Sequence, residues 1–323
     1  MAIVTKLQWD PRILEPVFRE IYAREHENQK QNFIPLFYNE VNSNKDTEHY
    51  EGVGAEGTME EWGYSNHQVH YDSVEELWPK SIKNRKFSDG REIDRDWIDD
   101  LKLSQIRQRI QSMARSVHRT QQLQAAEFLN NAFVTTGPNW RGRLDNYAGP
   151  DGRPLCATDH PFSPTNDKDV QSNKGNSPLS IDSWDATAVA MQEWVDDRGN
   201  PMPMIPDTLI VHPYNARAAF QIAGLPEKEL PPYEPGSNEF NANMYMGNIK
   251  VIVCPFIRAE NRKNWFAVDS SRLKDLNIWQ WRRKPETGNI TDFETETLKF
   301  KVVGRWAYGF LDYTFIYGHE VLD

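Results

Sequence analysis

Residues 99–133 read DDLKLSQIRQRIQSMARSVHRTQQLQAAEFLNNAF and carry a long helical pattern. A helix of about 35 residues spans roughly 50 Å and is longer than most helices of globular proteins. We therefore predict a long spine helix. Its apolar stripe is formed by Ile106, Ile110, Met113, Val117, Ala125, Phe128, Leu129 and Ala132, while Arg107, Arg115, His118 and Arg119 lie elsewhere on its surface.

A polar stretch of about 45 residues, rich in Gly, Pro, Asn and Asp, follows this helix and includes DGRPLCATDHP at 151–161. The chain regains an ordered pattern at Leu179. Irregular loops of that length are uncommon in compact domains. A subunit that must reach its neighbours in an assembly uses them more readily than an enzyme does, so this stretch favours a structural role.

Composition limits the class of protein. With 323 residues, of which 38% are apolar, the chain is long enough for about two domains with real cores. A formal net charge of −10 argues against nonspecific DNA binding through a dominant basic surface, so any contact with nucleic acid is expected to be local or weak.

Cysteines and hydropathy indicate where the protein is made. Two cysteines, Cys156 and Cys254, are too few for a disulfide framework, which fits a reducing cytoplasm. The N-terminus lacks the apolar core of a signal peptide, and no run of about 18 apolar residues occurs. Secretion and membrane insertion are therefore disfavoured.

Residues 51–92 form glycine-punctuated, extended-looking segments, which we interpret as a two-stranded arm. Its two limbs have opposite charge, which cross-strand pairing would exploit. The acidic limb carries Glu51, Glu56, Glu60 and Glu61, and the basic limb carries Lys80, Lys83, Arg85, Lys86 and Arg91.

Apolar patterning predicts the remaining elements. Helices are expected at 11–27, 184–197 and 214–223, and strands at 207–211, 249–254, 265–268, 277–283, 297–303 and 310–317. The last three strands are expected to belong to one sheet.

Three groups of residues could suggest chemistry, and none of them supports it. His67, His70 and Asp72 lie at spacings that face opposite sides of a strand, and no further ligand motif follows. The Cys156 to His160 loop holds a thiol and an imidazole, but catalysis needs a third orienting group in a closed pocket. The glycines near residue 54 lack the Lys and Ser or Thr of a phosphate loop. We therefore predict no catalytic, cofactor-binding or metal-binding residues.

The order of these features resembles the major capsid (head) proteins of tailed bacteriophages, in the Mu-like and related branches that share the Hong Kong ninety-seven fold. The resemblance rests on six segments, each weakly specific alone: GAEGTMEEW at 54–62, FSDGREI at 87–93, and residues 125–133, 152–161, 206–213 and 309–313. They follow one another in the same order, so the resemblance extends over most of the chain.

The resemblance implies an α+β phage major capsid fold. Its parts would be an N-terminal arm at 1–50, an extended E-loop hairpin at 51–92, a peripheral domain at 93–179 and 276–323 with the spine helix and a β-sheet, and an axial domain at 180–275. Such proteins form hexamers and pentamers that close an icosahedral head around double-stranded DNA. The expected location is the virion, after synthesis in the host cytoplasm.

The resemblance also implies partners. No long, charged helical extension precedes the arm, so a separate scaffolding protein is expected, together with portal and decoration proteins; DNA contact would be weak and no membrane is involved. No cofactor is implied. Two alternatives remain open at this point: an encapsulin-type nanocompartment shell, and a soluble hydrolase that uses the Cys156 to His160 loop.

Because an isolated two-stranded ribbon is marginally stable in water, the arm is expected to lie across a neighbouring subunit. Apolar contact would come from Met59, Trp62, Tyr64 and Trp78. The predicted assembly interface also includes the charged residues of both limbs, Glu56, Glu60, Glu61, Lys80, Lys83, Arg85 and Lys86, and the spine arginines Arg107, Arg115 and Arg119 of the partner.

Overall fold

The computed structural model describes most of the chain, in two compact units. The described residues are 11–27, 31–55, 57–59, 61–62, 71, 73–100, 102–224, 247–292, 294–295 and 297–322. Unit 1 comprises Met1–Glu48, Ile82–Ala125 and Trp279–Tyr308, and unit 2 comprises His49–Ser81, Ala126–Ile278 and Gly309–Asp323. Within the described residues, no helix combines the length and the apolar content that a bilayer crossing requires.

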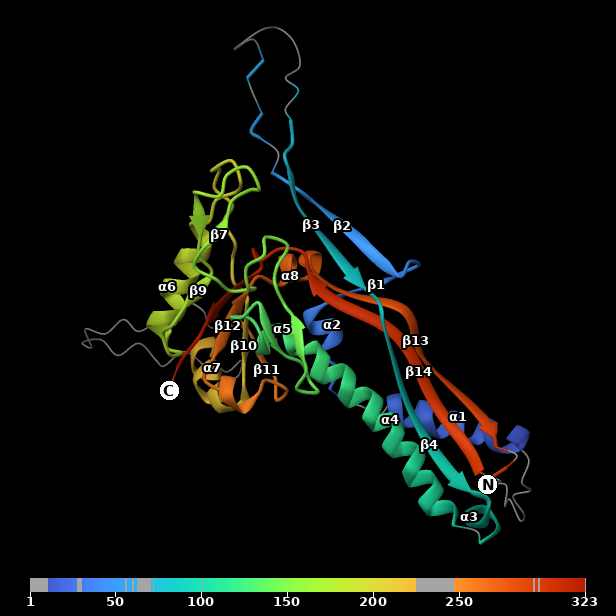
Figure 1. Ribbon diagram of the computed structural model, residues 1–323. Coiled ribbons are helices and arrows are strands. Elements are labelled where there is room, and N and C mark those ends of the chain that lie inside the picture. The colour runs from blue at the N-terminus through green and yellow to red at the C-terminus, as the bar shows by residue number, and fades with distance from the viewer. Residues whose placement is uncertain are drawn as a thin grey trace, which may run out of the picture. The chain divides into compact units, whose positions relative to one another are not determined.

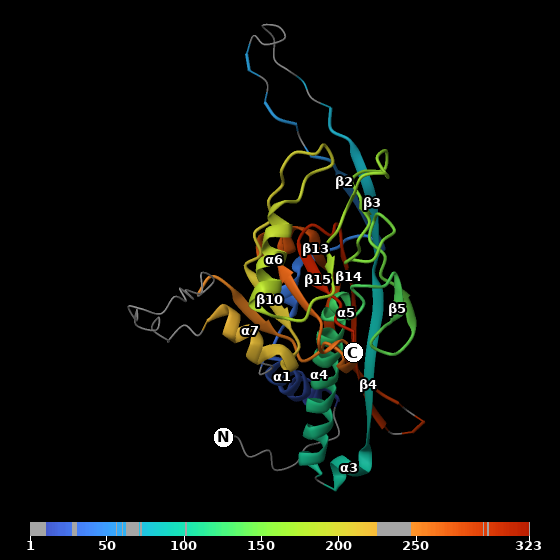
Figure 2. The same cartoon turned by 90° about the vertical axis from the view of Figure 1, so that its left-hand side faces the viewer.

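Unit 1 combines helices with an antiparallel sheet. Its helices are α1 (Pro11–Glu27), α2 (Ile34–Phe37), α3 (Arg95–Asp99) and α4 (Leu103–Ala125). The sheet has the order β1 (Asn39–Asn42), β13 (Asn277–Thr291), β14 (Thr297–Phe310) and β4 (Arg85–Asp94). Helix α4 packs against α1 and β4, and Figures 1 and 2 both show it running alongside β4.

The core of unit 1 lies between α4 and the sheet. The apolar stripe of α4 is buried there as predicted, with Ile110 and Met113 each 1% exposed. Burying each such side chain contributes about 1.5 to 3 kcal/mol. The cluster consists of Tyr22, Ile93, Ile106, Ile110, Met113, Ala114, Val117, Leu298, Phe300 and Val302.

The spine helix is shorter than its sequence pattern predicts. It ends at Ala125 after 23 residues, and a separate short helix, α5 (Glu127–Asn130), follows in unit 2. The cause is the buried carboxylate of Glu127, which accepts hydrogen bonds from the Trp140 backbone N (2.6 Å) and the Tyr147 hydroxyl (2.8 Å). Those bonds tie the segment after Ala125 to the loop of unit 2.

Unit 2 is built around a mixed five-stranded sheet. The strand order is β11 (Lys250–Val253), β10 (Thr208–Val211), β12 (Trp265–Val268), β15 (Ile316–His319) and β9 (Lys174–Gly175). Every residue of β10 and β12 is buried, as continuous apolar runs predict. Helices α6 (Ile181–Gln192) and α7 (Ala216–Ala223) contribute to one apolar cluster with both strands. The short elements η1 (Pro213–Asn215), η2 (Ala259–Asn261) and α8 (Ser270–Leu276) complete this part.

The predicted single sheet of late strands is wrong in one member. Strands β13 and β14 are neighbours in unit 1, but β15 pairs with β12 in unit 2. The chain turns before β15 because the Asp312 carboxylate accepts bonds from the Tyr313 backbone N (2.7 Å) and the Thr314 hydroxyl (2.8 Å). That turn ends the extended run at Phe310.

The long polar loop is more ordered than predicted. It contains two paired ribbons, β5 (Thr136–Pro138) with β6 (Leu144–Asn146) and β7 (His160–Pro161) with β8 (Val170–Gln171). The fully buried Asn173 fastens it to the sheet: its amide donates to the carbonyls of Leu155 (2.8 Å) and Ile316 (3.1 Å) and accepts from the Ala157 backbone N (2.8 Å).

The compact units divide the chain differently from the predicted domain limits. Residues 126–179 and 309–323 belong to unit 2 with the predicted axial segment 180–275, whereas we expected both in the peripheral domain. Of the predicted peripheral domain, α4 and most of β13 and β14 belong to unit 1.

Candidate functional site

The predicted arm begins as a two-stranded ribbon (Figure 1). Strand β2 (Thr47–Val53) pairs with β3 (Glu76–Lys83), and the ribbon continues where the Gly54 backbone N donates to the Glu75 carbonyl (2.8 Å). A Cβ atom at Gly52 would lie 2.8 Å from Leu77 Cβ, so the two limbs pack closely there. The predicted residues Glu56, Glu60 and Tyr64 lie outside the described residues.

The second limb of the arm is shorter than predicted. Arg85, Lys86 and Arg91 lie on β4, which pairs with β14 in register Trp306 to Arg85. The reason is a half-buried face of β4 that the charges obscure in the sequence: Phe87 stacks on Trp306 with ring centroids 4.4 Å apart. These three basic residues therefore belong to the sheet of unit 1 and do not face an acidic limb.

The predicted pairing of opposite charges along the arm is wrong for the two lysines of β3. Lys80 Nζ donates to the Ala148 carbonyl (2.5 Å) and lies over the Phe310 ring. Burial lowers the pKa of Lys80, an effect that the charge of Asp151 opposes. Lys83 lies 4.0 Å from the carboxylate of Asp46, with both side chains exposed.

The apolar residues of the arm are exposed where the structure describes them. Met59 is 98% exposed, Trp62 is 66% exposed and Tyr71, which the sequence pattern did not single out, is 88% exposed. Glu61 is also exposed. Large apolar patches mark interaction sites, and these three large exposed apolar side chains lie on the described part of this one segment.

The spine arginines lie on one helix, α4. Arg107 and Arg119 are exposed, whereas Arg115 pairs with Glu25 of α1 at 2.6 Å. One of the three predicted interface arginines is therefore engaged within unit 1.

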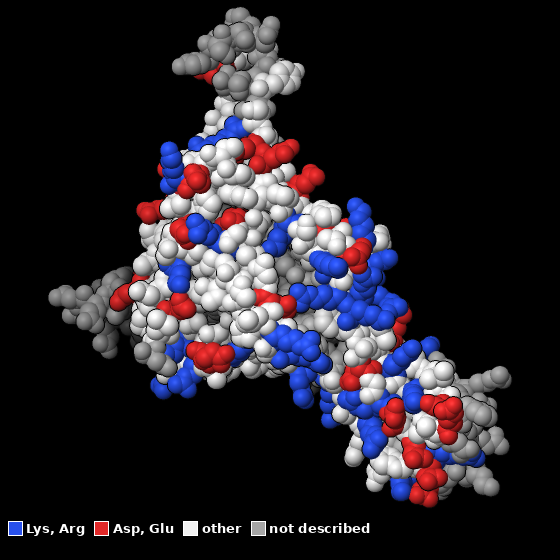
Figure 3. All heavy atoms as spheres, viewed as in Figure 1, with Lys and Arg blue, Asp and Glu red and all other residues white. Residues whose placement is uncertain are grey.

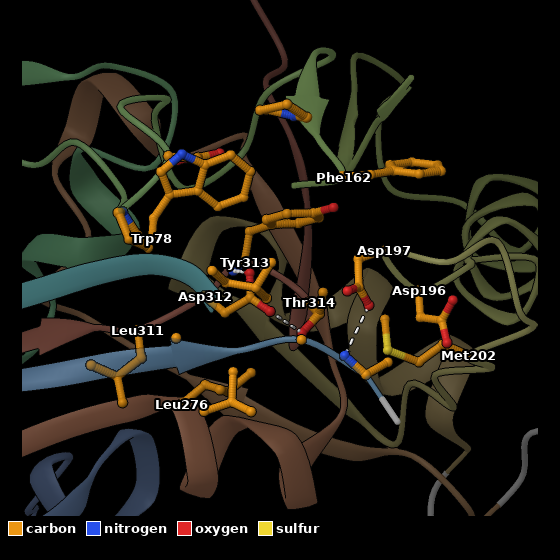
Figure 4. A pocket seen from close by; sticks show the side chains of 18 of the residues that line it. Trp78, Phe162, Asp196, Asp197, Met202, Leu276, Leu311, Asp312, Tyr313 and Thr314 are labelled. Atoms are coloured by element: carbon orange, nitrogen blue, oxygen red, sulfur yellow. Dashed lines mark hydrogen bonds between the residues drawn. The ribbon is translucent and has the colours of Figure 1, made fainter. Parts of the chain in front are cut away.

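A pocket of about 390 Å³ lies in unit 2 at the base of the arm (Figure 4). Asp197 fixes the arm there, because its carboxylate accepts a hydrogen bond from the backbone N–H of Ala55 at 2.9 Å. The Asp312 carboxyl also lines the pocket, and burial raises its pKa against the lowering effect of its bonds from Thr314 and Tyr313. Trp78, the fourth predicted apolar contact of the arm, is half-buried in this pocket.

Sequence reasoning missed this pocket because its walls come from distant segments. They are 51–55, 77–78, 150–151, 161–162, 195–197, 202, 272, 276 and 310–314. No local motif unites these positions. In Figure 4 the labelled aromatic side chains Trp78, Tyr313 and Phe162 lie above the labelled carboxylates Asp312, Asp197 and Asp196.

The structure separates the thiol and the imidazole of the Cys156 to His160 loop. Cys156 is fully buried beside Phe133 and Gly318, and burial raises the pKa of its thiol well above the usual range. His160 Nδ1 lies 2.6 Å from Asp151, and its ring stacks on Tyr313. Within the described residues, His160 Nε2 has no hydrogen-bond partner, so no nucleophile is positioned on it.

A further question is whether side chains are grouped to bind a metal ion. The rejected candidates His67, His70 and Asp72 lie outside the described residues. In the part of the chain that the structure describes, no three His, Cys, Asp or Glu side chains are grouped to hold a metal ion.

The chain has the fold of phage capsid subunits. It superimposes on a structure of Mycobacterium phage Patience with a TM-score of 0.53 and 13% identity, covering 97% of this chain and 88% of that one. A virus-like particle from Pyrococcus furiosus gives a TM-score of 0.52 at 10% identity, with 94% and 98% covered. Microbacterium phage Oxtober96 gives 0.50 at 10% identity, with 89% and 90% covered.

Sequence comparison assigns the family. No curated protein matches the chain. The model of the phage capsid protein family matches residues 79–318, a span that includes α4, the long loop and the strands of both sheets except β1 and the last residue of β15. The chain therefore belongs to the phage capsid protein family, as a structural protein of the capsid shell.

Proposed function

We infer that copies of this chain assemble into hexameric and pentameric capsomers, which close an icosahedral head around double-stranded DNA. The observation that carries the proposal is the exposed apolar surface of the arm at Met59, Trp62 and Tyr71. A two-stranded ribbon with such side chains in water gains order when it lies across another subunit. Membership of the phage capsid family supports the same conclusion.

The domain roles form part of the proposal. The N-terminal arm is residues 1–50, and the E-loop is the ribbon that β2 and β3 begin, so it is shorter than 51–92. The peripheral domain is centred on α4 and the sheet of unit 1. The axial domain is 180–275, whose strands β10, β11 and β12 belong to unit 2.

We also propose that the role is structural and not catalytic. The buried thiol of Cys156, with its raised pKa, disfavours the hydrolase alternative, because the thiolate is the reactive form. The phage capsid family disfavours the encapsulin alternative. A separate scaffolding protein, a portal and decoration proteins are the further partners of this proposal, with synthesis in the host cytoplasm and the virion as the final location.

The test removes the apolar end of the arm. The double variant Met59→Ser and Trp62→Ser should keep the circular dichroism spectrum of the folded chain and lose shells in electron micrographs. A matched control, Leu144→Ser with Ile205→Ser, removes two other exposed apolar side chains, 73% and 65% exposed, and should assemble normally. Normal shells from the arm variant, or an equal loss of shells in the control, would refute the proposal.

A further inference from the structure

The exposed face of α4 consists of hydrogen-bond donors. Every exposed residue of α4 that the structure describes is Ser, Gln or Arg: Ser104, Gln105, Arg107, Gln108, Arg109, Ser112, Arg115 and Arg119. The helix carries four arginines and no Asp or Glu, although the whole chain has a net charge of −10. Figure 3 shows basic side chains in this region of the molecule, with acidic side chains next to them. Positive charge is therefore concentrated on this helix, although the chain as a whole is acidic.

An open groove of about 520 Å³ runs along this face in unit 1. It is lined by Arg91, Trp97, Gln105, Gln108, Arg109 and Ser112, none of which carries a negative charge. The Arg109 guanidinium lies 4.1 Å from the centre of the Trp97 ring and donates to the Glu92 carbonyl at 3.0 Å. Stacking and hydrogen bonding hold this guanidinium in place before any ligand arrives.

Carboxylates close to the groove have cations of their own. Asp89 pairs with Arg91 at 2.6 Å, and Asp100 pairs with Lys102 at 2.8 Å. Glu92 lies 3.7 Å from Lys299. Asp89 therefore offsets the charge of Arg91, which lines the groove, and Glu25 offsets that of Arg115. Among the described side chains, these carboxylates do not pair with Arg107, Arg109 or Arg119 of α4.

Two arginines of α4 keep their full donor capacity. Within the described residues, Arg107 and Arg119 make no ion pair or side-chain hydrogen bond. They are 12 positions apart, which places them about 18 Å apart along the helix axis. Over that length a DNA duplex presents roughly ten phosphates. The two arginines are also about 120° apart around the helix axis, so they would contact one duplex from the two sides of the exposed face.

The chemistry of the face distinguishes between two kinds of partner. Protein interfaces are centred on buried apolar and aromatic side chains, and the exposed face of α4 has none. Interfaces with DNA are more polar and more positive, and Arg, Gln and Ser are side chains that commonly contact phosphate oxygens. A phosphodiester backbone fits this face better than an acidic protein does.

We propose that the exposed face of α4 and its groove bind the phosphate backbone of duplex DNA. The inference rests on the proposed function, in which the shell encloses DNA. A single subunit contacts only a few phosphates, so its affinity is low and depends on salt. Repetition over the subunits of a shell multiplies the contact without a strongly basic surface.

The test measures duplex binding by the purified full-length chain as salt is raised from low concentration. Each lost phosphate contact lowers the slope of log affinity against log salt by about 0.9. Arg107→Gln with Arg119→Gln should therefore reduce the slope by about 1.8. The control, Arg282→Gln with Arg283→Gln, removes the same charge from exposed positions of β13 and should leave the slope nearly unchanged.

Four results would overturn the assignment: no duplex binding by the unmodified chain at low salt, an unchanged slope in the variant of Arg107 and Arg119, equal loss of slope in both variants, or tighter binding of polyglutamate than of the duplex. Electron microscopy of shells formed by the same variants separates this inference from the proposed function. Shells that form normally while the slope does not change would refute only the DNA contact.

Discussion

The imidazole of His319 donates its Nε2 hydrogen to Thr187, whose Oγ1 lies 2.8 Å away. The opposite ring nitrogen, Nδ1, accepts the backbone N–H of Ser177 at 3.2 Å, so it has no room for a second proton. The ring also stacks on the fully buried Trp265 with centroids 4.0 Å apart. His319 is therefore held in one neutral tautomer inside unit 2.

This geometry predicts a pH dependence of stability. Burial lowers the pKa of His319 from 6.5 to about 4. Between those values the unfolded chain binds a proton that the folded chain does not. The contribution of neutral His319 to the free energy of unfolding is therefore complete above pH 6.5. It is lost as the pH falls toward 4, and the total loss is about 3 kcal/mol.

Urea unfolding between pH 4.5 and 7.5 checks this prediction. The variant His319→Gln should show a weaker loss of unfolding free energy on acidification than the unmodified chain, because it lacks the group that must take up a proton. Identical pH profiles for the two proteins would contradict the assignment.

Gly175 should not tolerate a side chain. A Cβ atom at this position would lie 2.3 Å from Cε1 of His319, closer than atoms can pack. Gly175→Ala should therefore lower the free energy of unfolding by about 1 to 3 kcal/mol. At Gly288 the nearest atom to a new Cβ is Lys301 Cε at 3.4 Å, so Gly288→Ala serves as the control and should cost little. Equal midpoints in denaturant titrations of the two variants would count against the steric explanation.

Ile110 should be a main stabilising residue of unit 1. It is 1% exposed at the centre of the contact between α4 and the sheet. Truncation to Ala leaves a cavity and should cost about 2 to 5 kcal/mol. Ile290→Ala, at a position 65% exposed, should change the unfolding free energy by less than about 0.5 kcal/mol. Chemical denaturation followed by circular dichroism measures both, and a small effect at Ile110 would disprove its role.

Asn173 should determine the order of the long loop. Its side chain makes three buried hydrogen bonds, each worth about 1 kcal/mol. Asn173→Ala should therefore destabilise unit 2 by about 3 kcal/mol and speed hydrogen exchange at the amide of Ala157. Asn146→Ala, which removes a single bond to the Ala148 backbone N at an exposed position, is the control. Unchanged exchange at Ala157 would show that the loop is held by other contacts.

Helices and strands whose apolar residues form a regular local pattern could be predicted from the sequence. The strands β10 and β12 are continuous apolar runs, and both are fully buried where the pattern placed them. The apolar stripe of α4 recurs every three or four residues, so its buried face follows from helix geometry alone. The absence of carboxylates on α4 could also be read from the sequence, although its position beside the groove could not.

The sequence by itself determined which segments are helical or extended and which of their faces are apolar, because those properties depend on neighbouring residues. Only the tertiary structure decided where α4 ends, since the carboxylate of Glu127 accepts hydrogen bonds from the Trp140 backbone N–H and the Tyr147 hydroxyl. It likewise decided that β4 joins β14 and that β15 joins β12. Strand partners and pocket walls depend on contacts between residues far apart in the chain, and a local pattern carries no information about such contacts.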